Sequence, residues 1–285
     1  MSSLASTVTI VTGANTGIGR ATALELARRG AHVFVACRSE EKGREAIDGI
    51  KRETSNDKVD YLALDLASLD SVRRAAETFL AKDLPLPLLI NNAGVAGQQG
   101  QTADGFELHF GVNHLGHFLF TLLLEDKIKA SAPARIVNVS SGSHYQAKGI
   151  DFEAVRRPTK TITGLPEYEV SKLANVLFAK SHAKRLEGTG VTTYSVHPGV
   201  VASDAWRRIP WPIRKLMTLT MISNEEGSKT SLYCATSADC KDESGLYYDK
   251  CRVKEPSKLA HDTALAEELW RRSEAWVGLD QKKGS

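Results

Sequence analysis

The sequence predicts a single α/β domain, a doubly wound parallel sheet of about seven strands with helices on both faces. Short runs rich in Val, Ile and Leu alternate with longer segments of helical character, which is typical of repeated strand–helix–strand units. No internal repeat, low-complexity tract or linker divides the 285 residues, and α/β folds with one large sheet reach this length. We therefore assign residues 1–280 to one domain and the polar residues 281–285 to a disordered tail.

The expected strands are short and apolar, at residues 8–11, 32–36, 59–64, 88–90, 135–139, 192–196 and 246–248. The expected helices lie between and after them, at residues 17–29, 40–53, 69–81, 106–129, 168–186, 225–234 and 264–276. Two long connections, residues 143–166 and 200–224, interrupt this alternation. Both follow strand ends at the sheet edge where open α/β proteins bind ligands, so we expect them to frame a substrate site.

Composition and charge narrow the class of protein. The chain has 42% hydrophobic and 25% charged residues, as ordinary globular proteins do. Its net charge of +3 is too small to predict nucleic acid or an anionic membrane as the main partner. Four cysteines without CxxC spacing favour a reduced compartment. The first strand begins close to Met1 and no apolar run could span a bilayer, so we expect a cytoplasmic protein without an integral membrane segment.

The first strand runs into the turn TGANTGIG, which opens the first helix. Glycines let the backbone approach a pyrophosphate, and the helix N-terminus presents free N–H groups to it. In isolation such a turn can also be a tight strand-to-helix connection. Its place after the first strand favours a Rossmann-type dinucleotide site, and its expected contacts are Gly13, Asn15, Thr16, Gly17, Ile18 and Gly19.

The end of the second strand predicts the type of dinucleotide. An NAD site usually places an Asp or Glu there to bind the ribose 2′-hydroxyl, and this chain has Cys37-Arg38 instead. Arg38, together with Lys42, offers positive charge and donors suited to a 2′-phosphate. A solvated surface arginine is the alternative. Because the acid is missing, we expect NADP(H) as the cofactor.

Further polar motifs follow later strands. The run NNAG occupies residues 91–94, a serine pair ends the fifth strand at residues 140–141, and Tyr168 and Lys172 share one face of a helix. Each of these has a structural alternative, as a turn cap, a turn former or a surface pair. A phenol has an ordinary pKa of about 10, and a nearby ammonium and oxidised nicotinamide both lower it. We interpret Tyr168 as a general acid/base.

Together these motifs resemble the short-chain dehydrogenase/reductase family, over nearly the whole chain. The resemblance implies an NADP(H)-dependent oxidoreductase that moves a hydride between nicotinamide and a carbonyl or alcohol. It implies that Lys172 also bonds the nicotinamide ribose and that residues 91–94 brace the sheet. The cofactor contacts that it implies beyond the glycine turn are Asp65, Leu66, Asn92, Ala93, Gly94, Tyr168, Lys172, Pro198, Gly199 and Val200.

The same resemblance implies a catalytic group of Asn113, Ser141, Tyr168 and Lys172. Ser141 would polarise the substrate oxygen, whereas strand alternation turns Ser140 to the other side. Tyr168 would protonate the carbonyl oxygen in reduction or deprotonate the alcohol in oxidation. Asn113 would hold a helix irregularity and a proton-relay water near Lys172. A mid-helix asparagine that bonds only the backbone is the alternative.

His114 and His117 are spaced i, i+3, which invites a metal-site interpretation. No third ligand with suitable spacing accompanies them, and core or capping histidines are more frequent. We therefore expect no metal.

Longer stretches, among them TADGFELHFGVNHLGHF, SKLANVLF and GLYYDKC, are similar to the retinol dehydrogenase-like branch of the family. This similarity implies a lipophilic, retinal-like carbonyl substrate and the activity of a carbonyl reductase. Two features differ from that branch. Its members usually carry an N-terminal membrane anchor, whereas we expect no integral membrane segment here. Residues 143–166, with His144 and Tyr145, also differ. The apolar residues 209–222 suit a lid over a lipophilic ligand, ordinary packing or an interfacial helix.

Two alternatives stay open. LDLASLDSVR also resembles protochlorophyllide reductase, a light-driven relative, but that family has a cysteine where this chain has Ala174. A catalytically silent NADP(H)-binding sensor or scaffold is the alternative from another class, and the complete set of Ser141, Tyr168 and Lys172 argues against it. Relatives often pair through the helices at residues 106–129 and 168–186, so a homodimer is a further expectation.

Overall fold

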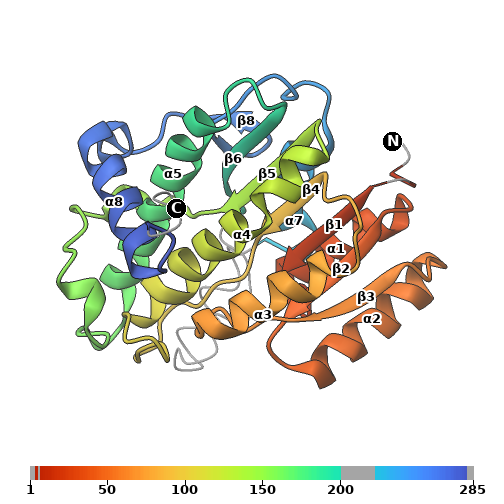
Figure 1. Ribbon diagram of the computed structural model, residues 1–285, viewed down its shortest axis with the longest axis horizontal. Helices are drawn as coiled ribbons and strands as arrows, with labels where there is room; N and C mark the ends of the chain where they lie inside the picture. The colour runs from red at the N-terminus through yellow and green to blue at the C-terminus, as the bar shows by residue number, and fades with distance from the viewer. Residues whose placement is uncertain (1–3, 6, 200–221, 281–285) are drawn as a thin grey trace.

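The computed structural model describes residues 4–5, 7–199 and 222–280 (Figure 1). Within these residues one sheet of eight strands has the order β3-β2-β1-β4-β5-β6-β7-β8. The strands are β1 Val8–Thr12, β2 His32–Cys37, β3 Val59–Ala63, β4 Leu88–Asn91, β5 Ala134–Val139, β6 Val191–His197, β7 Leu246–Asp249 and β8 Arg252–Val253. All adjacent pairs are parallel except β7 and β8. The reversal of strand order between β1 and β4 creates the crevice where such sheets bind ligands.

Helices cover both faces of the sheet (Figure 1). The helical segments are α1 Gly17–Arg28, α2 Glu40–Thr54, α3 Leu69–Leu80, η1 Phe110–Leu115, α4 Gly116–Ala130, η2 Gly142–Gln146, η3 Ala154–Arg156, α5 Leu165–Arg185, α7 Asn224–Thr236, η5 Lys258–His261 and α8 Thr263–Trp276. Alternate strand residues enter two cores: Val11 packs with α1, α2 and α7, whereas Ile10 packs with α3, α4, α5 and α8. The two apolar layers hold the sheet between them.

The predicted fold class is confirmed, and the seven predicted strands are present within about two residues at each end. The eighth strand, Arg252–Val253, was not predicted because its two exposed residues carry no apolar pattern. The assignment of residues 1–280 to one domain stays a prediction, and residues 281–285 lie outside the described part of the chain.

Two helices start more than one residue away from the predicted position. The helix expected from Phe106 begins two residues later, because Phe106 belongs to a turn in which its carbonyl accepts the Thr102 N–H. Residues Phe110–Leu115 then form a π-helix, which apolar periodicity does not distinguish from an α-helix. The helix expected from Tyr168 begins at Leu165, because Gly164 adopts a left-handed conformation (φ 63°) and Pro166 suits the first turn. Tyr168 therefore lies in the first turn of α5 rather than at its start.

Candidate active site

The glycine turn after β1 is packed tightly against the end of β4. Gly13 has φ 66°, and its N–H donates to the Ala36 carbonyl of β2 at 2.7 Å. A Cβ at Gly13 would lie 2.9 Å from Ala93 Cα, and one at Gly19 would lie 2.4 Å from the Gly13 carbonyl oxygen. The turn therefore needs glycine at both positions. It joins the ends of β1, β2 and β4 at the crevice edge.

Thr12 connects this turn to the run NNAG. Its hydroxyl oxygen accepts the N–H groups of Asn92 and Ala93, each at 2.9 Å, and Asn92 Nδ2 donates to the Thr12 carbonyl at 2.8 Å. Asn91 instead points inward, where its amide donates to Thr121 and Asn138. Asn91 thus braces the sheet, while Gly94 is exposed at the crevice edge.

The residues of the turn fit a dinucleotide. A Cβ at Gly17 would meet only Asn224 Oδ1, at 3.7 Å, among the described residues, so the backbone is open to a ligand. α1 begins at Gly17, and the first N–H groups of a helix have no partner within it. Asn224 Oδ1 is buried and has no hydrogen-bond partner within the described part of the chain. No sequence signal pointed to Asn224, because it approaches the turn only through the packing of α7 against α1.

Residues that follow β2 and β3 lie at the far end of this crevice. Arg38 and Lys42 are both exposed, just beyond the strand end to which Gly13 bonds. Asp65 caps its own turn by accepting the Ala67 N–H at 3.0 Å, and Leu66 is buried against Gly116. The exposed guanidinium and ammonium are therefore cationic groups that this edge can present to a ligand.

The three side chains expected to react converge between β5 and α5. The Tyr168 phenol lies close enough to the Ser141 hydroxyl for that group to lower the pKa of the phenol. Lys172 Nζ lies 5.5 Å from the centre of the Tyr168 ring and donates to the Val139 carbonyl at 3.0 Å. Ser140 turns away and donates to the Lys172 carbonyl at 2.7 Å. A Cβ at Gly94 would lie 3.5 Å from Lys172 Nζ, so the cluster borders the crevice.

Asn113 lies inside the π-helix and links it by hydrogen bonds to Val95 and to α5. Its Oδ1 accepts the Val95 N–H at 2.8 Å, and its Nδ2 donates to the Val95 carbonyl and to Ser171 Oγ. Its own carbonyl accepts a hydrogen bond from His117 Nδ1 at 3.0 Å. Asn113 therefore sits at the helix irregularity that the family resemblance implied. The proton-relay water stays a prediction.

The two histidines of the rejected metal site make separate core contacts. His117 Nε2 is bonded to the Thr12 hydroxyl at 2.8 Å, and His114 Nε2 to Ser273 at 3.2 Å. Burial lowers the pKa of His114 to about 3 and that of His117 to about 4, so both are neutral. Among the described residues no three His, Cys, Asp or Glu side chains are grouped to hold a metal ion.

The ends of β5 and β6 meet at His197. Its Nδ1 accepts the Gly142 N–H at 3.1 Å, and Pro198 and Gly199 follow at the crevice edge. A Cβ at Gly199 would lie 2.5 Å from Ile222 Cδ1. Val200 and all but the last residue of the expected lid at 209–222 lie outside the described residues.

His144 links Ser141 to the C-terminal part of the chain. The sequence did not indicate this contact. Its Nε2 accepts the Ser257 N–H at 3.1 Å, so its Nδ1 carries the proton and donates to the Ser141 carbonyl at 2.7 Å. The imidazole is fully buried, and burial lowers its pKa. Residues 113 positions apart are thereby joined at the site.

Burial governs the ionisation of the catalytic cluster. It raises the pKa of Tyr168, and the neighbouring Ser141 hydroxyl opposes that rise. The pKa of Tyr168 is therefore raised in the protein by itself, whereas the predicted fall also includes a bound oxidised nicotinamide and stays a prediction. Burial also lowers the pKa of Lys172 to about 8. The site thus holds a protonated phenol and a lysine that loses its charge unusually easily.

Replacing Lys172 with Met is expected to stabilise the cofactor-free protein. A lysine pKa of about 8, against an ordinary value of about 10.5, costs the folded state about 3 kcal/mol where both states are charged. Because the folded state releases this proton first, the cost is full below about pH 8 and fades as pH rises toward about 10.5. In the variant, the Val139 carbonyl still accepts a hydrogen bond from Asn175 Nδ2.

Chemical denaturation between about pH 7 and about pH 10 measures this difference in the free energy of unfolding. The gain from Lys172→Met should be largest at the acidic end and should shrink toward the alkaline end. Parallel stability curves for the two proteins would contradict the burial penalty.

A cavity of about 220 Å³ lies beside the first turn of α5, on the side of Val155, Glu167 and Val170. Ser141, Tyr168 and Lys172 do not line it. The substrate carbon must lie next to both the nicotinamide and the acid/base group, so we do not assign this cavity as the substrate site.

The C-terminal helix covers part of the two helices expected to form a homodimer. Trp270 of α8 packs against Phe118 of α4 at 5.1 Å and Phe178 of α5 at 5.7 Å between ring centres. Arg185 of α5 stacks on Trp270 and pairs with Glu267. A homodimer stays a prediction, and it would have to use a surface of these helices that α8 leaves free. Within the described residues no helix is both long and apolar enough to cross a bilayer.

The doubly wound sheet, the glycine turn and the Ser–Tyr–Lys cluster together have the architecture of a dinucleotide-dependent dehydrogenase. The family model for short chain dehydrogenases matches residues 7–211. Retinol dehydrogenase 12 of Mus musculus is 46% identical over 278 residues, which cover 95% of this chain and 86% of that protein. Retinol dehydrogenase 11 of the same species is 47% identical over 276 residues, with the same two coverages. The chain belongs to the short-chain dehydrogenase/reductase family, in its retinol dehydrogenase-like branch.

A solved structure has the same fold. A protein of uncharacterised function from Mycobacterium paratuberculosis superposes with a TM-score of 0.78 at 30% identity, covering 98% of this chain and 96% of that one. The family acts with nicotinamide cofactors on carbonyl and alcohol groups, so the chain is an oxidoreductase of this kind.

Proposed function

We propose that this protein is an NADP(H)-dependent enzyme that interconverts a lipophilic aldehyde or ketone, retinal-like compounds included, with its alcohol. The convergence of the Ser141 hydroxyl, the Tyr168 phenol and the Lys172 ammonium beside the glycine turn carries the proposal. Exposed Arg38 at the end of β2, in a position without a carboxylate, supports the choice of NADP(H). Similarity to the retinol dehydrogenases supports a lipophilic substrate. A cytoplasmic location stays a prediction.

Each residue has one task in the proposed reaction. The bound dinucleotide supplies or accepts the hydride. Ser141 donates a hydrogen bond to the substrate oxygen and orients it, and Tyr168 gives that oxygen its proton in reduction or removes it in oxidation. Lys172 holds positive charge near the phenol, which stabilises the phenolate after proton transfer. Asn113 holds Val95 and α5 in place around Tyr168 and Lys172 through its hydrogen bonds.

The pH dependence of the two directions should be opposite. Burial raises the pKa of Tyr168, so the phenol is protonated at neutral pH and ready to act as an acid. The kcat of reduction should therefore fall as pH rises through the pKa of Tyr168, whereas the kcat of oxidation should rise. Steady-state pH profiles in both directions check this, and profiles with the same sign would contradict the role of Tyr168.

A substrate screen tests the proposal as a whole. The purified protein is mixed with NADPH or NADH and a panel of aromatic, aliphatic and retinoid aldehydes, and nicotinamide absorbance is followed. We expect turnover with NADPH that increases with the lipophilicity of the aldehyde. Binding of NADPH without turnover of any carbonyl would favour a sensor, and turnover that requires illumination would favour a protochlorophyllide reductase-like enzyme.

A further inference from the structure

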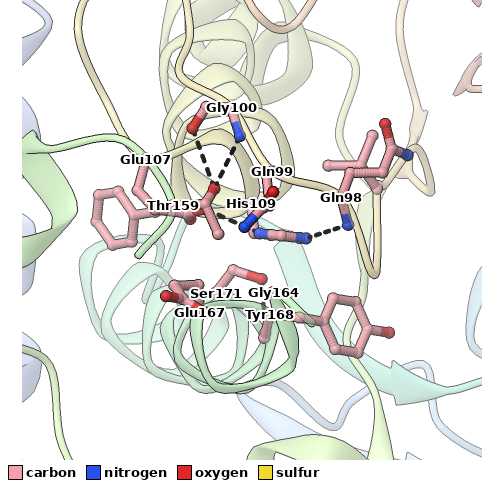
Figure 2. Close-up of polar contacts among 12 residues, drawn as sticks. Gln98, Gln99, Gly100, Glu107, His109, Thr159, Gly164, Glu167, Tyr168 and Ser171 are labelled. Carbon is pink, nitrogen blue, oxygen red and sulfur yellow. Dashed lines mark hydrogen bonds and ion pairs between the residues drawn. The ribbon is translucent and has the colours of Figure 1, made fainter. Parts of the chain in front are cut away.

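A buried carboxylate–imidazole pair lies directly beside the first turn of α5. Glu107 is 3% exposed and His109 is fully buried. His109 Nδ1 and Glu107 Oε1 are 2.8 Å apart. The Gln98 N–H points at His109 Nε2 at 3.5 Å, so the proton of the imidazole lies on Nδ1 and is donated to Glu107 (Figure 2). A buried charge in such a place needs a full set of donors.

Glu107 has that full set. Besides His109, it accepts hydrogen bonds from Thr159 Oγ1 at 2.5 Å and from the Phe110 N–H at 2.8 Å. Burial acts to raise the pKa of Glu107, but these three donors more than offset it and hold the pKa below its ordinary value. Glu107 is therefore a carboxylate at neutral pH. It ties the start of the π-helix to the residues before α5.

His109 contacts two parts of the catalytic side. Its ring meets the Tyr168 ring edge-on, at 6.2 Å between ring centres and 75° between planes. A Cβ at Gly164, the residue that caps α5, would lie 2.7 Å from His109 Cε1 and 2.6 Å from the Gln98 carbonyl oxygen. The Gly164 carbonyl accepts the Tyr168 N–H at 2.9 Å. Figure 2 shows His109 between the loop that carries Gln98 and the turn of α5 that carries Tyr168.

We propose that the Glu107–His109 pair is a positioning element that holds the Tyr168 ring and the cap of α5 in the geometry needed for proton transfer. This inference rests on the proposed role of Tyr168 as the acid/base. The carboxylate fixes the orientation of the imidazole, and the imidazole edge limits rotation of the phenol. Thr159 Oγ1 also accepts the Gly100 N–H at 3.2 Å, so residues 97–100, which follow the run NNAG, are held by the same pair. The pair does not touch the reacting atoms.

The test replaces the ring while keeping the carboxylate partnered. His109→Asn retains an amide donor near the position of Nδ1 but lacks the edge that contacts Tyr168. The matched control is His182→Gln in the same helix as Tyr168. His182 is also fully buried, its Nε2 pairs with Glu125 at 2.8 Å, and its ring stacks on Phe178. His182→Gln keeps a donor near the position of Nε2, about 20 Å along α5 from Tyr168.

We expect His109→Asn to lower kcat for the best aldehyde about 10- to 100-fold, since a displacement of about 1 Å has such an effect on catalysis. The Kd of NADPH should stay within about twofold, and the control should lose a similar amount of thermal stability with kcat within about twofold. Equal losses of kcat in the two variants, or an unchanged kcat in His109→Asn, would overturn the proposal.

A second readout does not depend on turnover. The Tyr168 phenol is titrated by phenolate absorbance, as the difference between proteins with Tyr168 and with Tyr168→Phe, in the presence and absence of His109→Asn. A released ring gains contact with water, so the pKa of Tyr168 should fall toward about 10 in the His109→Asn background. An unchanged titration would also contradict positioning. If the wild-type protein reduces no carbonyl, the proposed function fails, and this titration still decides the role of the pair.

Discussion

Replacing Tyr168 with Phe is expected to lower kcat for carbonyl reduction about 10³-fold, within the range of about 10² to 10⁴ typical of general acids. The variant removes only the hydroxyl that lies near Ser141 and keeps the ring that packs near Lys172 and His109. The Kd of NADPH should therefore change by less than about threefold, and the thermal midpoint by a few degrees at most. Steady-state kinetics and fluorescence titration with NADPH measure the two quantities.

Tyr145→Phe is the matched control. Tyr145 is 37% exposed, follows Ser141 by four positions, and its hydroxyl bonds the Glu255 carbonyl rather than the reacting group. Its loss should leave kcat within about threefold, as expected for a surface hydroxyl. If Tyr168→Phe keeps more than a tenth of the wild-type kcat, Tyr168 is not the acid/base.

Replacing Arg38 with Asp should reverse the preference between the two dinucleotides. Arg38 is exposed at the end of β2, beside the strand residue that bonds the glycine turn. Loss of charge-assisted hydrogen bonds to a 2′-phosphate, at about 1.5–3 kcal/mol, and repulsion by the new carboxylate both weaken NADPH binding. The same carboxylate suits a ribose 2′-hydroxyl. We expect the ratio of kcat/KM for NADPH over NADH to fall about 10²- to 10³-fold.

The control for this change of charge is Arg52→Asp, at the exposed far end of α2. It alters the net charge equally but lies a helix length, about 20 Å, from Arg38. The cofactor ratio should stay within about twofold, because exposed charges at this separation are screened. A variant Arg38→Asp that still prefers NADPH as strongly as the wild type would refute the assignment of Arg38.

Much of the fold followed from local patterns. Strands that are buried on both faces, such as β1 and β2, require mostly apolar runs. The edge strand β3 is partly exposed and still has Val, Tyr and Leu, so β1 to β7 were recognisable. Gly13 and Gly19 marked a turn that no larger residue can form. The exposed strand Arg252–Val253 and the π-helix at Phe110–Leu115 were not recognisable. Neither element has a distinctive periodicity in the sequence. The strand forms because it pairs with β7, and the π-helix depends on the fit of Asn113 against Val95.

For the site, the sequence by itself determined the chemistry available: a phenol and an amine one helical turn apart, a serine at a strand end, and an arginine in place of an acid. Only the tertiary structure decided which side chains hold that chemistry in place. His144 bonds Ser141 and also Ser257, which lies 113 positions further along the chain, and Glu107 with His109 supports Tyr168. Contacts of this kind depend on the arrangement of neighbouring elements in space, and residues distant along the chain carry no shared periodicity that would reveal them.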